Sequence, residues 1–199
     1  MPSPSTGSGT ASRREELLGI AAELFAEKGF KNTTVRDIAD AAGILSGSLY
    51  HHFDSKESMV DELLDTFQTE LWRQYDEIEA SDRTPREKLE AVVRASFDAI
   101  GSHRNEVAIF QSDAVFLTSF ERFAYLGERN QKFRELWTRL LSEGVERGEL
   151  RADLDVELVY RFLRDTVWVA VRWYRPGGAL SPGDVADQYL SILLEGIAT

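Results

Sequence analysis

The sequence predicts an all-α protein, and three observations support this fold class. Apolar residues recur at intervals of three and four in almost every segment after Ala11, which is the spacing of one face of a helix. No stretch of five or more residues alternates between polar and apolar side chains, as a half-buried strand would. Signals that start and stop helices lie between these segments. We therefore expect about nine helices, and a hydrophobic content of 43% is enough to build a core.

The first ten residues differ from the rest of the chain in composition. They consist mainly of Ser, Gly, Pro and Thr, so we expect residues 1–10 to form a disordered arm. They also lack the apolar stretch of a signal peptide. The first helix is expected over 12–28, because an apolar stripe ends there at Gly29, a residue suited to the left-handed end of a helix. The stripe consists of Leu17, Leu18, Ala21, Leu24 and Phe25.

Two short helices are expected next. One covers 34–42. Thr33 and Thr34 can cap its start, and Gly43 ends it. The other begins at Ser46 and ends near Phe53. The apolar faces of the three helices must pack on each other, so residues 11–56 are predicted to form a separate three-helix head.

The rest of the chain, residues 57–199, is predicted to be a helical bundle that forms a dimer. A capping threonine, a proline and a glutamate at Thr84, Pro85 and Glu87 mark one helix start in particular. The last two helices have more apolar surface than one body can cover, which indicates a homodimer. The expected helices cover 54–79, 85–100, 106–116, 121–147, 156–175 and 182–198.

Composition argues against several other classes of protein. The chain has no cysteine and only three histidines, so we expect neither disulfides nor a metal site. No pair of carboxylates stands out from the ordinary charged faces, and we expect no catalytic residues, no cofactor and no enzyme activity. No run of eighteen apolar residues occurs, so we expect a cytoplasmic protein with no membrane partner.

The charge of the chain is unevenly distributed. The total is −11, but residues 11–56 contain six basic and seven acidic residues and carry only −1, which leaves −10 on the rest. DNA repels an acidic surface. An acidic body behind a near-neutral head would turn the head toward DNA.

The two short helices have the pattern of a helix-turn-helix, in which the second helix enters the major groove of DNA. Ser46, Gly47 and Ser48 at the start of that second helix are small enough for close approach to bases and phosphates. Tyr50 and His51 look too polar for the core of so short a helix. Lys56 begins the following helix, where its charge and the helix start would attract a phosphate.

Each of these residues also has a structural interpretation. Tyr50 or His52 could be partly buried, and Arg36 could pair with Asp40. Lys56 could be an ordinary exposed lysine.

Residues 33–57 resemble the signature of the tetracycline-repressor family; they read TTVRDIADAAGILSGSLYHHFDSKE. The resemblance implies an all-helical dimer whose last two helices form a four-helix bundle with the partner's, and a body whose ligand spreads the two heads apart. Leu45 departs from the pattern, since many members have a polar residue there, and no base contact is assigned to it. The DNA contacts that the resemblance implies fall on Thr34, Arg36, Ser46, Gly47, Ser48, Tyr50, His51, His52 and Lys56.

Residues 153–178 resemble one branch of that family, the actinobacterial repressors of cholesterol catabolism. The resemblance implies control of genes for steroid-ring degradation and release from operator DNA by an acyl-coenzyme A thioester. Alternatives are a regulator of the same family with an unrelated hydrophobic or cationic effector, an enzyme, and a helical module that binds other proteins.

The same segment has an unusual run of arginines. Arg161, Arg164, Trp168, Arg172 and Arg175 recur at intervals of three and four, so we expect them on one helix face. Glu157 can pair with Arg161, whereas Arg164 and Arg172 have no acid three or four positions away. Such a face would suit an amphipathic anion, and we predict Arg164, Trp168 and Arg172 as ligand contacts. The other interpretation is that the arginines pair with neighbouring helices and the tryptophan is dimer core.

Overall fold

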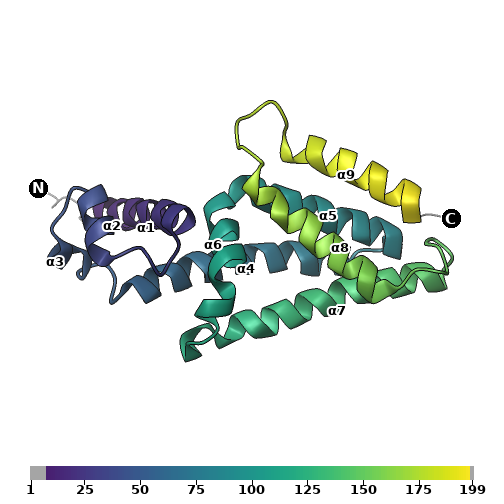
Figure 1. Ribbon diagram of the computed structural model, residues 1–199, viewed down its shortest axis with the longest axis horizontal. Coiled ribbons are helices and arrows are strands. Elements are labelled where there is room, and N and C mark those ends of the chain that lie inside the picture. Colours follow the sequence, from purple (N-terminus) through teal and green to yellow (C-terminus); the bar gives the residue numbers. More distant parts are fainter. Residues whose placement is uncertain (1–7, 198–199) are drawn as a thin grey trace, which may run out of the picture.

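The computed structural model describes residues 8–197, and within this range the chain forms nine α-helices and two short 3₁₀ helices (Figure 1). The described range contains no strand, which confirms the predicted all-α class. The elements are α1 (Ser8–Lys28), α2 (Val35–Ala41), α3 (Ser46–Leu49), α4 (Lys56–Glu79), α5 (Pro85–Ser102), α6 (Arg104–Leu117), η1 (Glu121–Phe123), α7 (Ala124–Glu146), α8 (Val156–Val169), η2 (Ala170–Arg172) and α9 (Pro182–Ile197).

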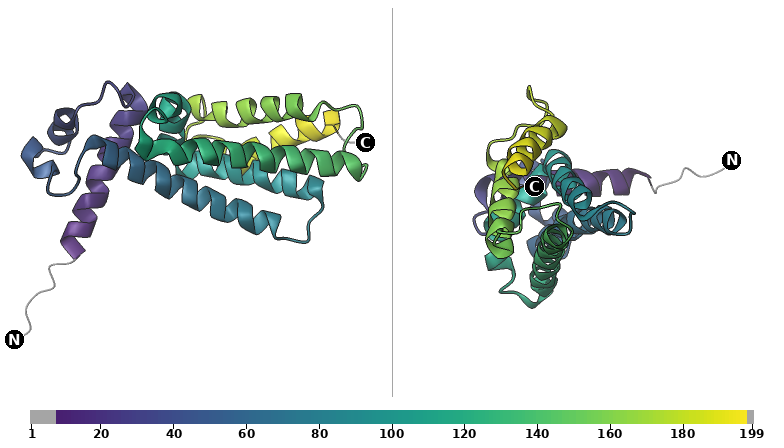
Figure 2. Two further views of the ribbon diagram at one scale, coloured as in Figure 1. Left: turned by 90° about the horizontal axis from the view of Figure 1, so that it is seen from below. Right: turned by 90° about the vertical axis from the view of Figure 1, so that its right-hand side faces the viewer.

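The molecule has a small head at one end and a helical bundle at the other, with the C-terminus at the end of the bundle far from the head (Figures 1 and 2). One hydrophobic core joins α1, α2 and α3 to the first half of α4 and to α6. A second core fills the bundle between α4, α5, α7, α8 and α9. Because α4 contributes to both cores, it connects the head to the bundle directly.

The first helix begins earlier than expected. It starts at Ser8, so residues 8–10 are helical and not part of an arm, while residues 1–7 lie outside the described range. Once the buried stripe around Leu17 and Phe25 has formed a helix, each further residue adds a hydrogen bond at little extra cost. The start of α1 consequently projects from the head (Figure 2).

Side-chain caps fix the start of several helices. Thr34 and Asp37 form a reciprocal capping box at α2, and Ser55 and Ser58 do the same at α4. The capping box predicted at Thr84 is present at α5, with proline in the first turn. These caps satisfy amides that would otherwise lack partners at a helix start.

The helix expected over 156–175 is shorter than predicted. Regular α-helix ends at Val169, and residues 170–172 form the tighter turn η2. Proline at 176 disfavours helical backbone in the residue before it, so the helix cannot continue through Arg175. The change of pitch rotates later side chains away from the face that Arg161, Arg164 and Trp168 occupy. Arg172 and Arg175 therefore do not continue that face, and the predicted five-residue stripe is wrong beyond Trp168.

No helix within residues 8–197 has the length and apolar character that crossing a membrane requires.

Candidate DNA-binding head and body cavity

The head has the geometry of a helix-turn-helix. Gly43 has a φ of 65°, a left-handed conformation that glycine adopts without strain, and it turns the chain between α2 and α3. The amide of Ile44 donates to Ala39 O at 3.0 Å and fixes that turn. Ile38 and Leu49 are buried against α1, so the two short helices have one orientation relative to the head.

The recognition helix α3 and the turns after it lie at the end of the molecule farthest from the bundle (Figure 1). The regular helix stops at Leu49, earlier than the expected end near Phe53, and the amides of His51 and His52 continue it as turns. Tyr50 is 56% exposed and His51 is exposed, whereas His52 is half-buried. Gly47 is exposed between the half-buried Ser46 and Ser48. These residues form one accessible edge of the head.

Thr34 and Arg36 differ in how free they are to meet DNA. The Thr34 hydroxyl donates to Asp37 Oδ2 at 2.6 Å and accepts from the Asp37 amide at 3.1 Å. Its single proton is therefore used inside the cap. The side chain of Arg36 is 84% exposed, and its pairing with Asp40 at 3.5 Å is the exposed i, i+4 type that contributes little. Arg36 is thus the better placed of the two for a phosphate.

Lys56 makes contacts within the protein, and the phosphate contact that the sequence predicts for it stays a prediction. Its Nζ donates to Phe30 O and to Thr33 O, both at 2.8 Å, and lies 4.3 Å from the centre of the Phe30 ring. Two of the three ammonium protons are consequently bound within the protein. Lys56 holds the turn between α1 and α2 onto the start of α4.

Most other cations of the head also have partners inside the protein. Arg13 donates to Ala42 O at 2.9 Å, and Arg14 pairs with Glu62 and lies over the Phe53 ring. Lys28 is 3.9 Å from Asp37, and Lys31 Nζ lies 3.8 Å from the centre of the Phe116 ring. These side chains stabilise the head and its contact with the body.

Phe30 connects the head to two helices of the body at once. Its ring is buried beside Phe25 and Phe116, with centroid distances of 5.4 and 6.4 Å. Its amide donates to Asp113 Oδ2 on α6 at 3.1 Å, while its carbonyl accepts from Lys56 on α4. We call Phe30, Lys56 and Asp113 together the Phe30 junction.

The role of Asp113 was not predicted, although the sequence contains a signal for it. Ile109, Asp113 and Leu117 are four residues apart and are all buried, so a carboxylate interrupts the apolar stripe of α6. A buried charge requires a partner. That partner is a backbone amide 83 residues earlier in the chain, a contact that local spacing cannot show.

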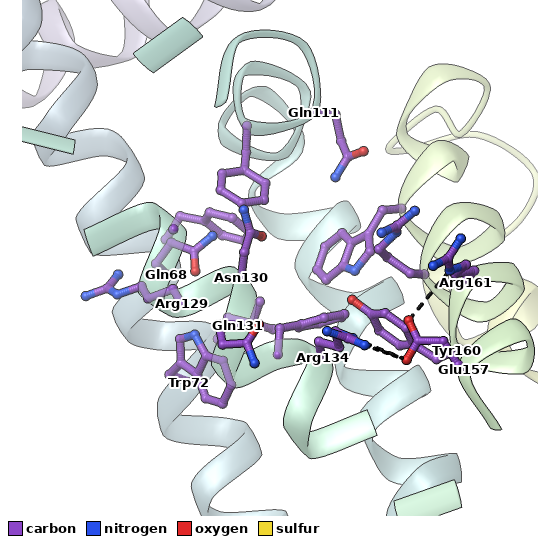
Figure 3. A pocket seen from close by; sticks show the side chains of 17 residues that line it. Gln68, Trp72, Gln111, Arg129, Asn130, Gln131, Arg134, Glu157, Tyr160 and Arg161 are labelled. Atoms are coloured by element: carbon purple, nitrogen blue, oxygen red, sulfur yellow. Dashed lines mark hydrogen bonds and ion pairs between the residues drawn. The ribbon is translucent and has the colours of Figure 1, made fainter. Parts of the chain in front are cut away.

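A cavity of about 570 Å³ lies in the body between α4, α6, α7 and α8 (Figure 3). Its apolar walls come from rings such as Phe67, Phe110, Phe133 and Trp168. The Trp168 ring is buried and lies 6.0 Å from Phe133 and 6.5 Å from Phe67, centroid to centroid. The cavity therefore offers aromatic surface to a flat apolar group.

The charged groups that line the cavity are mostly cationic. They are Arg129, Arg134, Arg161 and Arg164, with Glu157 as the one carboxylate among the described lining residues. Glu157 lies between Arg134 at 2.9 Å and Arg161 at 3.6 Å, and the hydrogen bond from Arg134 lowers the pKa of Glu157 (Figure 3). In a chain of net charge −11, this lining is a local positive region.

The predicted ligand residues are not all at this cavity. Arg164 and Trp168 line it, but Arg172 is exposed in η2 and is not among its lining residues. Arg175 lies instead with Arg104 beside a second hollow against α1. Arg164 also has an acid partner, since its Nε donates to the adjacent Asp165 at 2.7 Å. Asp165 is the next residue in the chain, so the helical spacing of three and four residues does not identify it as the partner of Arg164.

Two polar groups on α4 and α7 line the cavity and were not predicted. Gln68 is only 5% exposed. Arg129 donates through Nη2 to Asp65 at 2.8 Å, while its Nη1 is buried without a hydrogen-bond partner. An unpaired buried donor at a cavity wall costs free energy, and an acceptor on a ligand would remove that cost.

Two family descriptions together match most of the chain. "Bacterial regulatory proteins, tetR family" matches residues 17–63, and "Tetracyclin repressor-like, C-terminal domain" matches residues 82–197. The chain is 60% identical to the HTH-type transcriptional repressor KstR2 of Rhodococcus jostii (strain RHA1) over 192 residues, which are 96% of this chain and 94% of the relative. It is 56% identical to the repressor of the same name from Mycobacterium tuberculosis (strain H37Rv), covering 94% of this chain and 93% of the relative.

Solved structures agree with this similarity. The structure of the ketosteroid transcriptional regulator KstR2 of Mycobacterium tuberculosis matches with a TM-score of 0.91 and 55% identity, covering 94% of this chain and 95% of that one. The fold is also shared with AibR, crystallised with isovaleryl coenzyme A and operator DNA, at a TM-score of 0.77, 23% identity, and coverage of 90% and 97%.

Replacing Lys56 with methionine tests its role in the Phe30 junction. The change leaves the carbonyls of Phe30 and Thr33 without their donor, so we expect the free energy of unfolding to fall by about 1–3 kcal/mol. Hydrogen exchange of the amides in 29–34 should become faster, and Arg36→Met, which removes an exposed cation from the same head, should not change it. Unchanged exchange in Lys56→Met, combined with loss of DNA binding, would instead make Lys56 a phosphate contact.

Proposed function

Because the chain belongs to the tetracycline-repressor family of bacterial transcriptional regulators, we propose that it is a homodimeric repressor released from its operator by an acyl-coenzyme A thioester formed during steroid degradation. Members of this family are DNA-binding regulators and generally not enzymes. The observation that supports the effector class is the body cavity, where aromatic rings and four arginines lie together. The identity of 53–60% to repressors called KstR2, one of which is described as a ketosteroid transcriptional regulator, supports the steroid pathway.

The exposed edge of the head would read the operator. Ser46, Gly47, Ser48, Tyr50 and His51 would face bases and nearby phosphates in the major groove. The half-buried His52 would lie at the margin of that surface. The Thr34 hydroxyl would have to release Asp37 before it could donate its proton to a phosphate. Arg36 would be the main phosphate contact on α2, because it is the most exposed of the ion-paired cations in the head.

Substitutions of Arg36 and Tyr50 should separate backbone contact from base readout. Arg36→Ala should weaken binding to all DNA sequences and lower the slope of log K against log salt by about one unit. Tyr50→Ala should instead relax the preference at particular operator positions. Arg83→Ala, in the turn between α4 and α5, removes an exposed arginine outside the head and should change neither property. Equal losses on operator and random DNA for Tyr50→Ala would contradict its assignment to base readout.

The surface of α8, η2 and α9 supports a dimer. Large apolar side chains are exposed there, although the body has a filled core of its own. A second copy of the chain would cover them and place two heads on one operator, with half-sites about one helical turn or a small multiple apart. The exposed residues are Leu158, Phe162, Val169, Trp173 and Ile192.

A charge within this apolar face should break the dimer. Phe162 is 62% exposed, so Phe162→Glu costs nothing in the core of one protomer but would bury a carboxylate against the partner. Light scattering at micromolar concentration should find a dimer for the parent and a monomer for the variant. Val115→Glu changes a 90% exposed residue on α6 and should remain dimeric. A dimeric Phe162→Glu protein would place the interface elsewhere.

The cavity has the chemistry that a bulky acyl thioester needs. The rings of Phe67, Phe133 and Trp168 would enclose the fused-ring acyl group, and Gln68 and Arg129 could donate to its oxygens. Arg161 and Arg164 are exposed at the cavity, where the phosphates of coenzyme A would find charge-assisted hydrogen bonds. The excess of arginine over carboxylate disfavours the alternative of a cationic effector.

The Phe30 junction would couple the cavity to the orientation of the head. The cavity is lined by Phe67 and Gln68 of α4 and by Phe110 and Gln111 of α6, the two helices that hold Phe30. An effector that changes the spacing of α4 and α6 would therefore change the orientation of the head. Release requires the effector to bind this altered arrangement more tightly than the DNA-bound one.

Substitutions at the cavity should affect effector response without affecting the head. Arg164→Gln and Trp168→Leu should leave an operator-binding dimer that needs more effector for release. A charge-assisted hydrogen bond is typically worth about 1.5–3 kcal/mol, so we expect a rise of roughly ten- to a hundredfold for Arg164→Gln. The measurement is operator release, by fluorescence anisotropy, against the concentration of a bicyclic steroid-derived coenzyme A thioester.

Arg172→Gln is the matched control for this experiment. It removes another exposed arginine 8 residues along the chain, but outside the cavity, and should respond like the parent. A parent-like response of Arg164→Gln together with a weakened response of Arg172→Gln would move the effector site out of the cavity and toward η2.

A further inference from the structure

Leu45 is the residue of the head whose exposure the fold does not explain. It is 80% exposed and lies at the N-cap of the recognition helix, with extended backbone at φ −74° and ψ 142°. Ile44 beside it packs against the head core, whereas Leu45 is not among the residues that pack there. The recognition helix lies at the end of the molecule farthest from the bundle, so the body does not cover this side chain (Figure 1).

The same position also lacks a helix cap. The helices on either side of it, α2 and α4, begin with the hydroxyl residues Thr34 and Ser55, each of which accepts a hydrogen bond from a backbone amide. Leu45 makes no such side-chain bond. Serine, threonine, aspartate and asparagine are much better N-caps than leucine. The free protein is therefore less stable than it would be with a polar residue here, which indicates that leucine serves a purpose in a complex.

The chemistry of that complex follows from the location. The residues after Leu45 are Ser46, Gly47 and Ser48, which are small and would allow the start of the helix to approach base edges closely. The edges of bases in the major groove present hydrogen-bond donors and acceptors and one apolar group, the C5-methyl of thymine. An exposed leucine at this point matches that group and no other feature of the groove.

We infer that Leu45 contacts the methyl group of one thymine in each operator half-site and makes that base a determinant of specificity. The inference rests on the proposed DNA-binding function of the head.

Deoxyuridine substitution tests the contact one methyl group at a time. The probe is the DNA site that the parent protein selects from a random-sequence pool, with each thymine in turn replaced by deoxyuridine, symmetrically in both half-sites. Removing the contacted methyl should weaken binding of the parent by about fourfold per half-site, the equivalent of one buried methyl group. Leu45→Ala should bind the site with thymine and the site with deoxyuridine at that position equally.

Leu45→Ser serves as the second variant, because it separates helix stability from readout. It restores a capping hydroxyl, so its thermal midpoint should rise by about 2–4 °C while its dependence on the thymine methyl disappears. Val115→Ala, on α6, should retain the full methyl dependence of the parent.

Two results would overturn the inference while leaving the DNA-binding function intact. One is a parent that binds its selected site with no loss at any deoxyuridine position. The other is a Leu45→Ala protein with the same methyl dependence as the parent. Failure of the parent to select any DNA site would overturn the proposed function itself.

Discussion

The orientation of the head depends on one backbone unit, the peptide groups on either side of Phe30. Its amide is bound by a carboxylate of α6 and its carbonyl by the ammonium group of α4, while its ring fills the space between the two helices and α1. A buried amide or carbonyl without a partner costs free energy, so the head is stable only where both partners are in reach. The turn between α1 and α2 is consequently bound to both α4 and α6. A change in the distance between α4 and α6 would therefore move this turn.

The distribution of charge gives the two ends of the molecule different properties. The chain is acidic overall, yet arginines from α7 and α8 gather at the cavity, and the carboxylates near them bind specific guanidinium groups. Glu157 holds Arg134 and Arg161 in place between two helices, and Asp65 holds Arg129. A carboxylate paired in this way fixes the direction of an arginine without neutralising the lining as a whole, since the cations outnumber the acids.

Much of the fold could be predicted from sequence because its signals are local. Apolar spacing gave the helices, and Thr84 and Gly43 marked a helix start and a turn that the structure confirms. What could not be predicted concerns contacts between distant residues and the finer geometry of helices. The tightening of the chain after Val169 removed Arg172 from the cavity, and no spacing rule shows a change of helical pitch ahead of a proline. The internal partners of Lys56 could not be predicted either, because the carbonyls of Thr33 and Phe30 lie 23 and 26 residues earlier in the chain.

The scarcity of uncommitted cations in the head has a consequence for how such a protein would search a genome. Attraction to any DNA comes mainly from free lysines and arginines that displace counterions from phosphates. Here most head cations are bound to carbonyls, carboxylates or rings, and the body is acidic. Random sequence would then retain the protein only briefly, and few copies would be lost to the large excess of other sites. A small number of molecules per cell would suffice to keep a matching site occupied.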